Sequence, residues 1–171
     1  MATKGKWAQG ITPRHFAWVI KDKLAVSERP GGYGQNHRKV RRQEEIIWIR
    51  EQGFTKVVSI IGAPHNLHNY DELGVKWVHC PLQQGDDTAK VLTVLYPELR
   101  SLTSSGGKVL LHGDELSDKV CGSVAGYLLW SGLLPDGPST ISAIEHLTNR
   151  QLGPDGRELV ALALRLRPTS A

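Results

Sequence analysis

The sequence is poor in cysteine, which limits how the chain can be stabilised. Only Cys80 and Cys121 occur among its 171 residues. Two thiols in otherwise apolar contexts do not make the disulfide framework of a small secreted protein. We therefore expect both to be reduced, and we predict a cytoplasmic protein.

Long apolar runs are also missing. No stretch approaches the roughly 18 apolar residues that a membrane-spanning helix needs, and residues 1–15 lack the apolar centre of a signal peptide. A composition of 40% hydrophobic and 22% charged residues is typical of one soluble domain with a real core. We predict a flexible segment over residues 1–15, a single domain over 16–166 and a tail over 167–171.

Acidic residues are scarce in the first third of the chain. Residues 1–50 carry 11 Lys/Arg and 4 Asp/Glu, a net charge of +7, whereas the remainder carries 10 and 13, a net charge of −3. The basic run 38–42 suits an acidic partner such as nucleic acid. Because no aromatic residues are interleaved with it, we favour a solvated helix face with ion pairs such as Arg41 with Glu45.

Hydrophobic periodicity and turn residues predict strands alternating with helices. The predicted strands are 16–20, 24–27, 56–61, 75–80 and 108–111. The predicted helices are 37–52, 67–73, 89–102, 119–129, 140–151 and 156–166, and Pro97 is expected to kink or shorten the third. This order predicts an α/β fold: a central, mostly parallel, twisted sheet flanked by helices, with a helical C-terminal part.

The stretch KVLLHGDELSDKVCGSVAGYLL, residues 108–129, contains the most informative loop. A buried strand, a tight polar loop and an apolar helix follow one another, a layout that places backbone N–H groups around an anion. Yet the loop contains Asp114, Glu115 and Asp118, and with Lys119 its formal charge is −3 + 1 = −2. Such a loop would repel a phosphate dianion.

Several phrases, in this order, resemble the cysteine-dependent protein phosphatases of the compact dual-specificity type. They are WVIKDKLAVSERPGG, KVVSII, VKWVHCPLQQGDD, KVLLHG, AGYLLWSG and AIEHLTNRQLGP, within residues 16–164. The resemblance implies the compact dual-specificity-phosphatase fold in a bacterial-type, single-domain protein. In that family a cysteine thiolate attacks phosphorus, an arginine and the loop N–H groups hold the phosphoryl oxygens, and an aspartate protonates the leaving group.

The family's signature is His-Cys, five residues, Arg, then Ser or Thr. By this resemblance His112 matches the histidine, but Gly113 falls on the cysteine, Lys119 on the arginine and Val120 on the hydroxyl residue. Glycine offers no nucleophile, and lysine lacks the planar fork that binds two phosphate oxygens. The resemblance therefore predicts a pseudophosphatase with a degenerate ligand-binding loop made of His112, Gly113, Asp114, Glu115, Leu116, Ser117, Asp118 and Lys119.

Our leading hypothesis is a catalytically inactive binding or regulatory protein whose partner, a protein or a small ligand, meets the altered loop. Asp118 is expected to cap the following helix and to occupy the N–H groups that phosphate would take. One alternative is a non-hydrolysing reader of a phosphorylated ligand through Lys119.

A second alternative is an enzyme that has turned the pocket to acid/base chemistry on a neutral or cationic substrate, so whether the chain is an enzyme stays open. Its candidate groups are Asp86, Asp87, His112, Asp114 and Glu115. The simpler role for Asp86 and Asp87 is to cap the helix that follows them. No spacing matches a metal motif, and we predict neither a metal nor a cofactor. Arg150 is either a pocket residue, as the resemblance implies, or a helix C-terminal charge.

Overall fold

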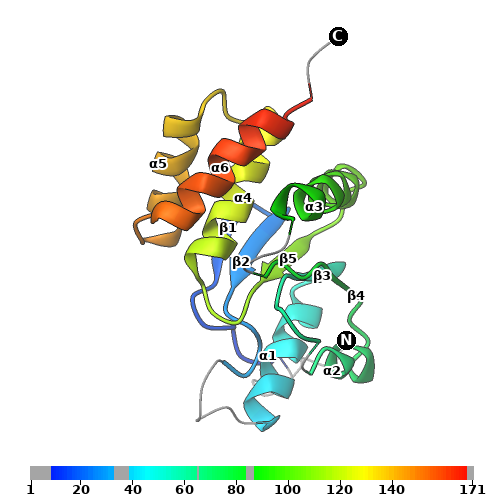
Figure 1. The fold of residues 1–171 in the computed structure, drawn as a ribbon. Helices are drawn as coiled ribbons and strands as arrows, with labels where there is room; N and C mark the ends of the chain where they lie inside the picture. Colours follow the sequence, from blue (N-terminus) through cyan, green and yellow to red (C-terminus); the bar gives the residue numbers. More distant parts are fainter. Residues whose placement is uncertain (1–8, 33–38, 65, 84–86, 169–171) are drawn as a thin grey trace.

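The computed structural model describes residues 9–32, 39–64, 66–83 and 87–168. Within these residues the chain forms a five-stranded sheet and six helices (Figure 1). The strands are β1 (Ala17–Ile20), β2 (Leu24–Ser27), β3 (Lys56–Ser59), β4 (Trp77–His79) and β5 (Val109–His112). The helices are α1 (Lys39–Glu51), α2 (His68–Glu72), α3 (Thr88–Ser104), α4 (Asp118–Trp130), α5 (Gly137–Thr148) and α6 (Pro154–Leu166).

The sheet has the strand order β1-β2-β5-β3-β4. β1 pairs with β2 antiparallel, and every other pairing is parallel. The register places Ser27 and Ser59 on either side of His112. The carboxyl ends of β2, β5 and β3 therefore meet at one edge of the sheet, the edge at which open α/β sheets bind ligands.

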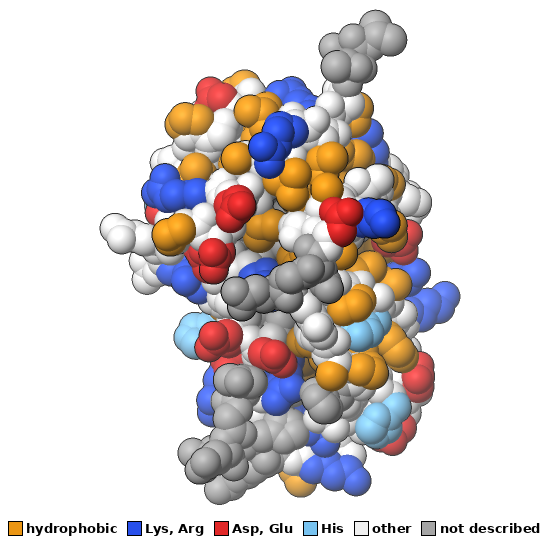
Figure 2. All heavy atoms as spheres, viewed as in Figure 1, with side chains coloured by type: hydrophobic (Ala, Val, Ile, Leu, Met, Phe, Trp, Pro, Cys, Tyr) orange, Lys and Arg blue, Asp and Glu red, His pale blue; other side chains and the backbone are white. Residues whose placement is uncertain are grey.

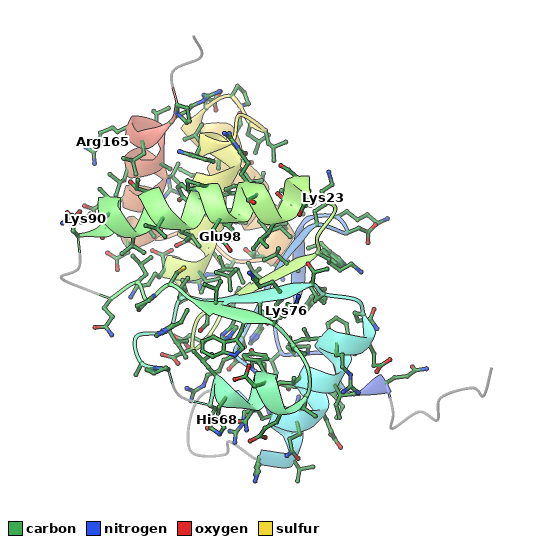
Figure 3. All side chains as sticks on the ribbon, turned by 90° about the vertical axis from the view of Figure 1, so that its right-hand side faces the viewer. Lys23, His68, Lys76, Lys90, Glu98 and Arg165 are labelled. Carbon is green, nitrogen blue, oxygen red and sulfur yellow. The ribbon has the colours of Figure 1, made fainter. Side chains whose placement is uncertain are left out.

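Helices cover both faces of the sheet, with α3, α4, α5 and α6 on one side and α1 and α2 on the other (Figures 1 and 3). Alternate strand residues explain the two layers, because successive side chains of a strand point to opposite faces. Val109 and Leu111 belong to the core beneath α3, α4 and α6. Leu110, between them, packs into the second core, which contains Ile46 and Ile49 of α1.

α4 is buried along most of its length because glycines let its neighbours approach closely. A Cβ on Gly122 would lie 2.5 Å from Gly156 Cα, and a Cβ on Gly126 would lie 2.3 Å from Tyr96 Oη. Both separations are below any real carbon contact. Gly122 therefore lets α4 meet the backbone of α6, and Gly126 makes room for the Tyr96 side chain of α3. This packing fixes the position of the loop that precedes α4.

The predicted α/β class, the parallel sheet and the helical C-terminal part are confirmed. The early end expected at Pro97 was wrong, since α3 continues through the proline to Ser104. Leu92, Leu95 and Leu99 bury the inner face of this helix on both sides of the proline, and tertiary packing of this kind outweighs a local break. α5 begins earlier than predicted, at Gly137, because the Asp136 side chain accepts from Ser139 N and Pro138 occupies the first turn.

The basic run near the N-terminus is part of α1. Arg41 Nε donates to Glu45 Oε1 at 2.8 Å, which is the predicted pair. The prediction of a solvated face was wrong at Arg42 and Glu45, because both residues are buried. Arg38 lies outside the described residues, as do residues 1–8 of the segment predicted to be flexible and residues 169–171 of the predicted tail. No helix in the described part of the chain is long and apolar enough to cross a membrane.

Candidate functional site

The candidate site lies at the carboxyl edge of the sheet, where β5 ends at His112 and the loop 113–117 leads into α4. A pocket of about 480 Å³ opens there. Its lining combines an apolar floor with several charged groups. The lining residues are Ile60, Ile61, Gly62, Leu82, Gln83, Gly113, Asp114, Glu115, Ser117, Asp118, Lys119, Val120 and Asp155.

Gly113 occupies the position at which the resembled family has its nucleophile. The residue is buried, and a Cβ built on it would lie 2.7 Å from Val120 Cγ2 and 3.9 Å from Ile60 Cγ1. A helical valine has one strongly preferred rotamer, so Val120 cannot easily turn aside. The space for a side chain at position 113 is therefore already filled by Val120.

Asp118 does not cap its own helix, so this prediction was wrong. Ser117 is the N-cap of α4, and its hydroxyl accepts from Val120 N at 3.3 Å. The Asp118 carboxylate instead accepts from Gly153 N at 2.6 Å and from Gly156 N at 2.5 Å. Asp118 thus provides the anion for the N-terminus of α6, because its side chain points across the α4–α6 contact.

Lys119, at the position of the family's arginine, is committed to another loop. Its Nζ donates to Leu82 O at 2.7 Å. This contact ties the start of α4 to the segment that follows β4. An ammonium fixed on a carbonyl oxygen is no bidentate clamp for phosphate.

Two arginines hold the rest of the loop. Arg29 Nη1 lies 3.2 Å from Asp114 Oδ1, and this aspartate is about half exposed. Arg150 donates to the carbonyl oxygen of Leu116. Arg150, which follows α5, therefore holds the loop from outside, because neither Arg150 nor Leu116 lines the pocket.

Glu115 is the exposed carboxylate of the loop. It lines the pocket together with Asp155, which is exposed in the first turn of α6. Figure 2 shows acidic side chains on the face of the molecule where α4 begins. The rim of the pocket is thus acidic, whereas its floor at Gly113, Val120 and Ile60 is apolar.

His112 is buried below the loop and is not an acid or base at neutral pH. Its Nδ1 is 2.9 Å from Gly113 O and its Nε2 is 3.1 Å from Tyr70 Oη. A neutral ring with the proton on Nδ1 satisfies both, donating to the carbonyl and accepting from the tyrosine. Burial is the main cause that lowers the pKa of His112 to about 4.

The candidate general acids lie apart from this pocket or outside the described residues. Asp87 is the N-cap of α3, and its side chain accepts from Lys90 N at 3.4 Å, which is the simpler role considered for it. Asp86 is not among the described residues. In the described ranges no group of three or more His, Cys, Asp or Glu side chains is placed to hold a metal ion.

Neither thiol lines this pocket. Cys80 and Cys121 are both free, and Cys121 is buried. Desolvation raises the pKa of both thiols, which makes the reactive thiolate scarcer.

The residues that anchor the loop were not predicted from the sequence. Arg29 lies 85 positions from Asp114 and Tyr70 lies 42 positions from His112. In the sequence Arg29 stands in the segment ERPGG, whose proline and glycines indicate only a turn and give no sign of a contact with Asp114. Such pairs are brought together by the sheet order, and no spacing in the sequence reveals them.

No protein-family model and no curated protein sequence matches this chain. Solved structures match its fold closely. One is Tk-PTP in its active form, with a TM-score of 0.71 and 16% identity over 90% of this chain and 98% of that one. Another is the kinase-associated phosphatase with its catalytic cysteine replaced by serine, with a TM-score of 0.73 and 17% identity over 87% and 93%.

A third match is the human tyrosine phosphatase-like serine/threonine/tyrosine-interacting protein, with a TM-score of 0.66 and 12% identity over 88% of this chain and 94% of that one. The chain therefore has the fold of the dual-specificity and tyrosine phosphatases, as its phrases predicted. Active phosphatases are among these neighbours, so the fold alone does not decide activity.

Proposed function

We propose that this chain is a pseudophosphatase: a phosphatase-fold protein without phosphocysteine catalysis that acts as a binding or regulatory protein. The observation that carries the proposal is the pair formed by Gly113 and Val120. A side chain at position 113 would meet Val120 Cγ2 at 2.7 Å. The pocket has thus been rebuilt around the missing nucleophile, and the covalent mechanism needs that nucleophile.

The charged groups of the loop support the same proposal. Asp118 binds two N–H groups of α6, Lys119 binds Leu82 O, and Asp114 pairs with Arg29. These contacts satisfy the loop without a ligand. A phosphoryl group entering the pocket would have to displace them and would also meet the acidic rim.

The surface left for a partner is the pocket rim with Glu115 and Asp155. Both carboxylates are exposed and line the same opening, so a protein surface or small ligand with positive charge fits best. The name of one neighbour describes an interacting protein with a phosphatase-like fold. Scarce cysteine and two free thiols favour a cytoplasmic setting.

An aryl-phosphate assay tests the loss of catalysis. The wild-type chain is expected to release no nitrophenolate from para-nitrophenyl phosphate above the buffer rate and to form no phosphoprotein. Turnover that scales with protein concentration and survives purification on different columns would contradict the proposal. Capture experiments then compare the wild type with Glu115→Lys, using Lys23→Glu on the distant β1–β2 turn as the control. A partner lost only in Glu115→Lys supports the rim as the binding surface.

A repurposed enzyme is the second candidate, and the exposure of Glu115 beside an apolar floor favours it over a phosphate reader. A carboxylate at such a rim is able to orient a cationic or neutral substrate. Any turnover found in a screen of amine, ester and amide substrates should fall strongly in Glu115→Gln and remain in Asp87→Asn. Equal turnover in both variants would remove this candidate.

A further inference from the structure

A second cavity lies at the other end of the helical layer, where α4 and α6 both end. Its volume is about 440 Å³, and its lining residues are Arg100, Trp130, Ser131, Gly132, Leu164, Arg167 and Pro168. α4 has 13 residues, so at 1.5 Å per residue this cavity is roughly 20 Å from the altered loop. It is therefore a separate site from the phosphatase-type pocket.

Arg100 lies in the C-terminal part of α3, where its guanidinium contacts the ring of Trp130. Its Cζ lies 4.2 Å from the centroid of the Trp130 ring, and this indole is only 8% exposed. Stacking on an aromatic face uses the π surface of the guanidinium and leaves its N–H donors pointing outward in the plane. Arg100 lines the cavity, so a guanidinium held against Trp130 forms part of its wall.

Arg167, the C-cap residue of α6, is fixed at a second wall. Its Nη1 donates to Pro135 O at 3.4 Å. Its Nη2 lies 3.7 Å from the position of a Cβ on Gly132, a residue with a φ of +82°. The Arg167 guanidinium therefore lies against the turn that follows α4, where the positive φ of Gly132 favours glycine.

The two cations have no acid beside them in this cavity. None of the lining residues is Asp or Glu, and in the described part of the chain no carboxylate pairs with Arg100 or Arg167. The nearby Asp136 caps α5, accepting from Ser139 N at 2.8 Å. Two like charges facing one cavity repel each other unless an anion lies between them.

The exposed carbonyl groups at the end of α4 do not account for these arginines. Tyr127 O, Leu128 O and Leu129 O accept from the backbone N–H groups of Ser131, Leu134 and Gly132, at 2.9, 3.2 and 3.1 Å. These carbonyls are satisfied by the chain itself. Apart from Arg167 Nη1, which donates to Pro135 O, the two guanidinium groups that line the cavity have donors left for a ligand.

We propose that this cavity binds a phosphate monoester dianion through Arg100 and Arg167. Guanidinium groups match phosphoryl oxygens in geometry as well as in charge. Leu164, which is 50% exposed, and Pro168 form an apolar wall that suits an aryl or alkyl group on the ester. The site does not depend on the proposed loss of catalysis, because it shares no residue with the altered loop.

Calorimetric titration of the full chain with phenyl phosphate at low ionic strength tests the proposal, with benzoate and inorganic phosphate as comparison probes. Arg100→Gln and Arg167→Gln should each weaken phenyl phosphate binding by about ten-fold or more, as expected for one charge-assisted contact. Arg165→Gln is the matched control, because Arg165 projects outward from the same helix on the side where α3 begins (Figure 3) and lines a different cavity. Binding should be unchanged there and in Lys119→Gln.

Several results would overturn the proposal. One is the absence of saturable phenyl phosphate binding to a wild-type chain that unfolds cooperatively. Others are equal weakening in Arg165→Gln, which would indicate only general charge attraction, and loss in Lys119→Gln alone, which would place the ligand in the altered loop. Benzoate binding as tightly as phenyl phosphate would contradict the preference for a dianion. Inorganic phosphate should bind more weakly than the ester, because it lacks the apolar group.

Discussion

Replacing Asp118 with alanine should destabilise the whole domain, although the residue lies in a loop that resembles an active site. The carboxylate accepts from Gly153 N at 2.6 Å and from Gly156 N at 2.5 Å, and both bonds are partly buried. A hydrogen bond to a charged group contributes about 1.5–3 kcal/mol, and loss of a helix cap costs about 0.5–2 kcal/mol. Since one carboxylate makes both bonds, we expect a loss of about 2–4 kcal/mol in the free energy of unfolding.

Urea unfolding of the purified variants, followed by circular dichroism at 25 °C, measures this loss. A change in midpoint at constant m-value shows that stability alone has changed. For a chain of this size the melting temperature should fall by about 4–16 °C. Asp118→Asn should fall between the wild type and Asp118→Ala, because an amide keeps one acceptor but turns a donor toward the second N–H group.

Asp155→Asn is the matched control for Asp118. It removes a carboxylate charge from the first turn of α6, the helix whose N-terminal N–H groups Asp118 binds, at an exposed position. Only the interaction with the helix dipole is lost there, about 0.3–1 kcal/mol. If Asp118→Ala were no more destabilised than Asp155→Asn, the structural role of Asp118 would be refuted and its carboxylate would be available for pocket chemistry.

Gly113 and His112 give two further predictions, one for the floor of the pocket and one for the end of β5 beneath it. Gly113→Ala should lower the free energy of unfolding by about 1–3 kcal/mol, because the new methyl group overpacks against Val120. Adding Val120→Ala should recover part of that loss. Additive losses in a double-mutant cycle of urea midpoints would contradict the contact. His112 has a folded pKa of about 4 against about 6.5 when unfolded, so the unfolded chain binds the extra proton between these values. The neutral imidazole of His112 therefore contributes its full share to the free energy of unfolding above pH 6.5. As the pH falls from 6.5 to 4, the free energy of unfolding should decrease by about 3 kcal/mol. Stability measured over this range should decline less in His112→Asn, and an identical decline would contradict a buried neutral imidazole.

The sequence was enough to predict the order of elements because strand and helix patterns are local. Continuous β-branched runs such as KVVSII marked buried strands, and Gly53 ended the first helix as expected. The exception at Pro97 arose from packing: the buried leucines of α3 hold the helix together beyond the proline. Local signals of this kind cannot weigh a tertiary contact.

The candidate site was predicted only in part, for a related reason. The glycine at position 113 is visible in the sequence, because it depends on the identity of one residue. The partners of Asp114, Asp118 and Lys119 are not visible, since each lies at least 35 positions away on another element. We expected the Asp118 carboxylate to cap α4, the helix that it begins. The close contact between α4 and α6 instead directs this carboxylate to the N-terminus of α6.

The most direct test of the central claim is an NMR titration of the isotopically labelled wild-type chain with inorganic phosphate. The backbone amides of the loop 113–118 report on the old phosphate cradle, whereas those of Ser131 and Gly132 report separately on the distant arginine cavity. We expect the loop amides to stay unshifted at phosphate concentrations that saturate any other site. Saturable shifts of the Gly113, Leu116 and Asp118 amides, abolished by Lys119→Gln, would contradict it and show that the loop still binds phosphate.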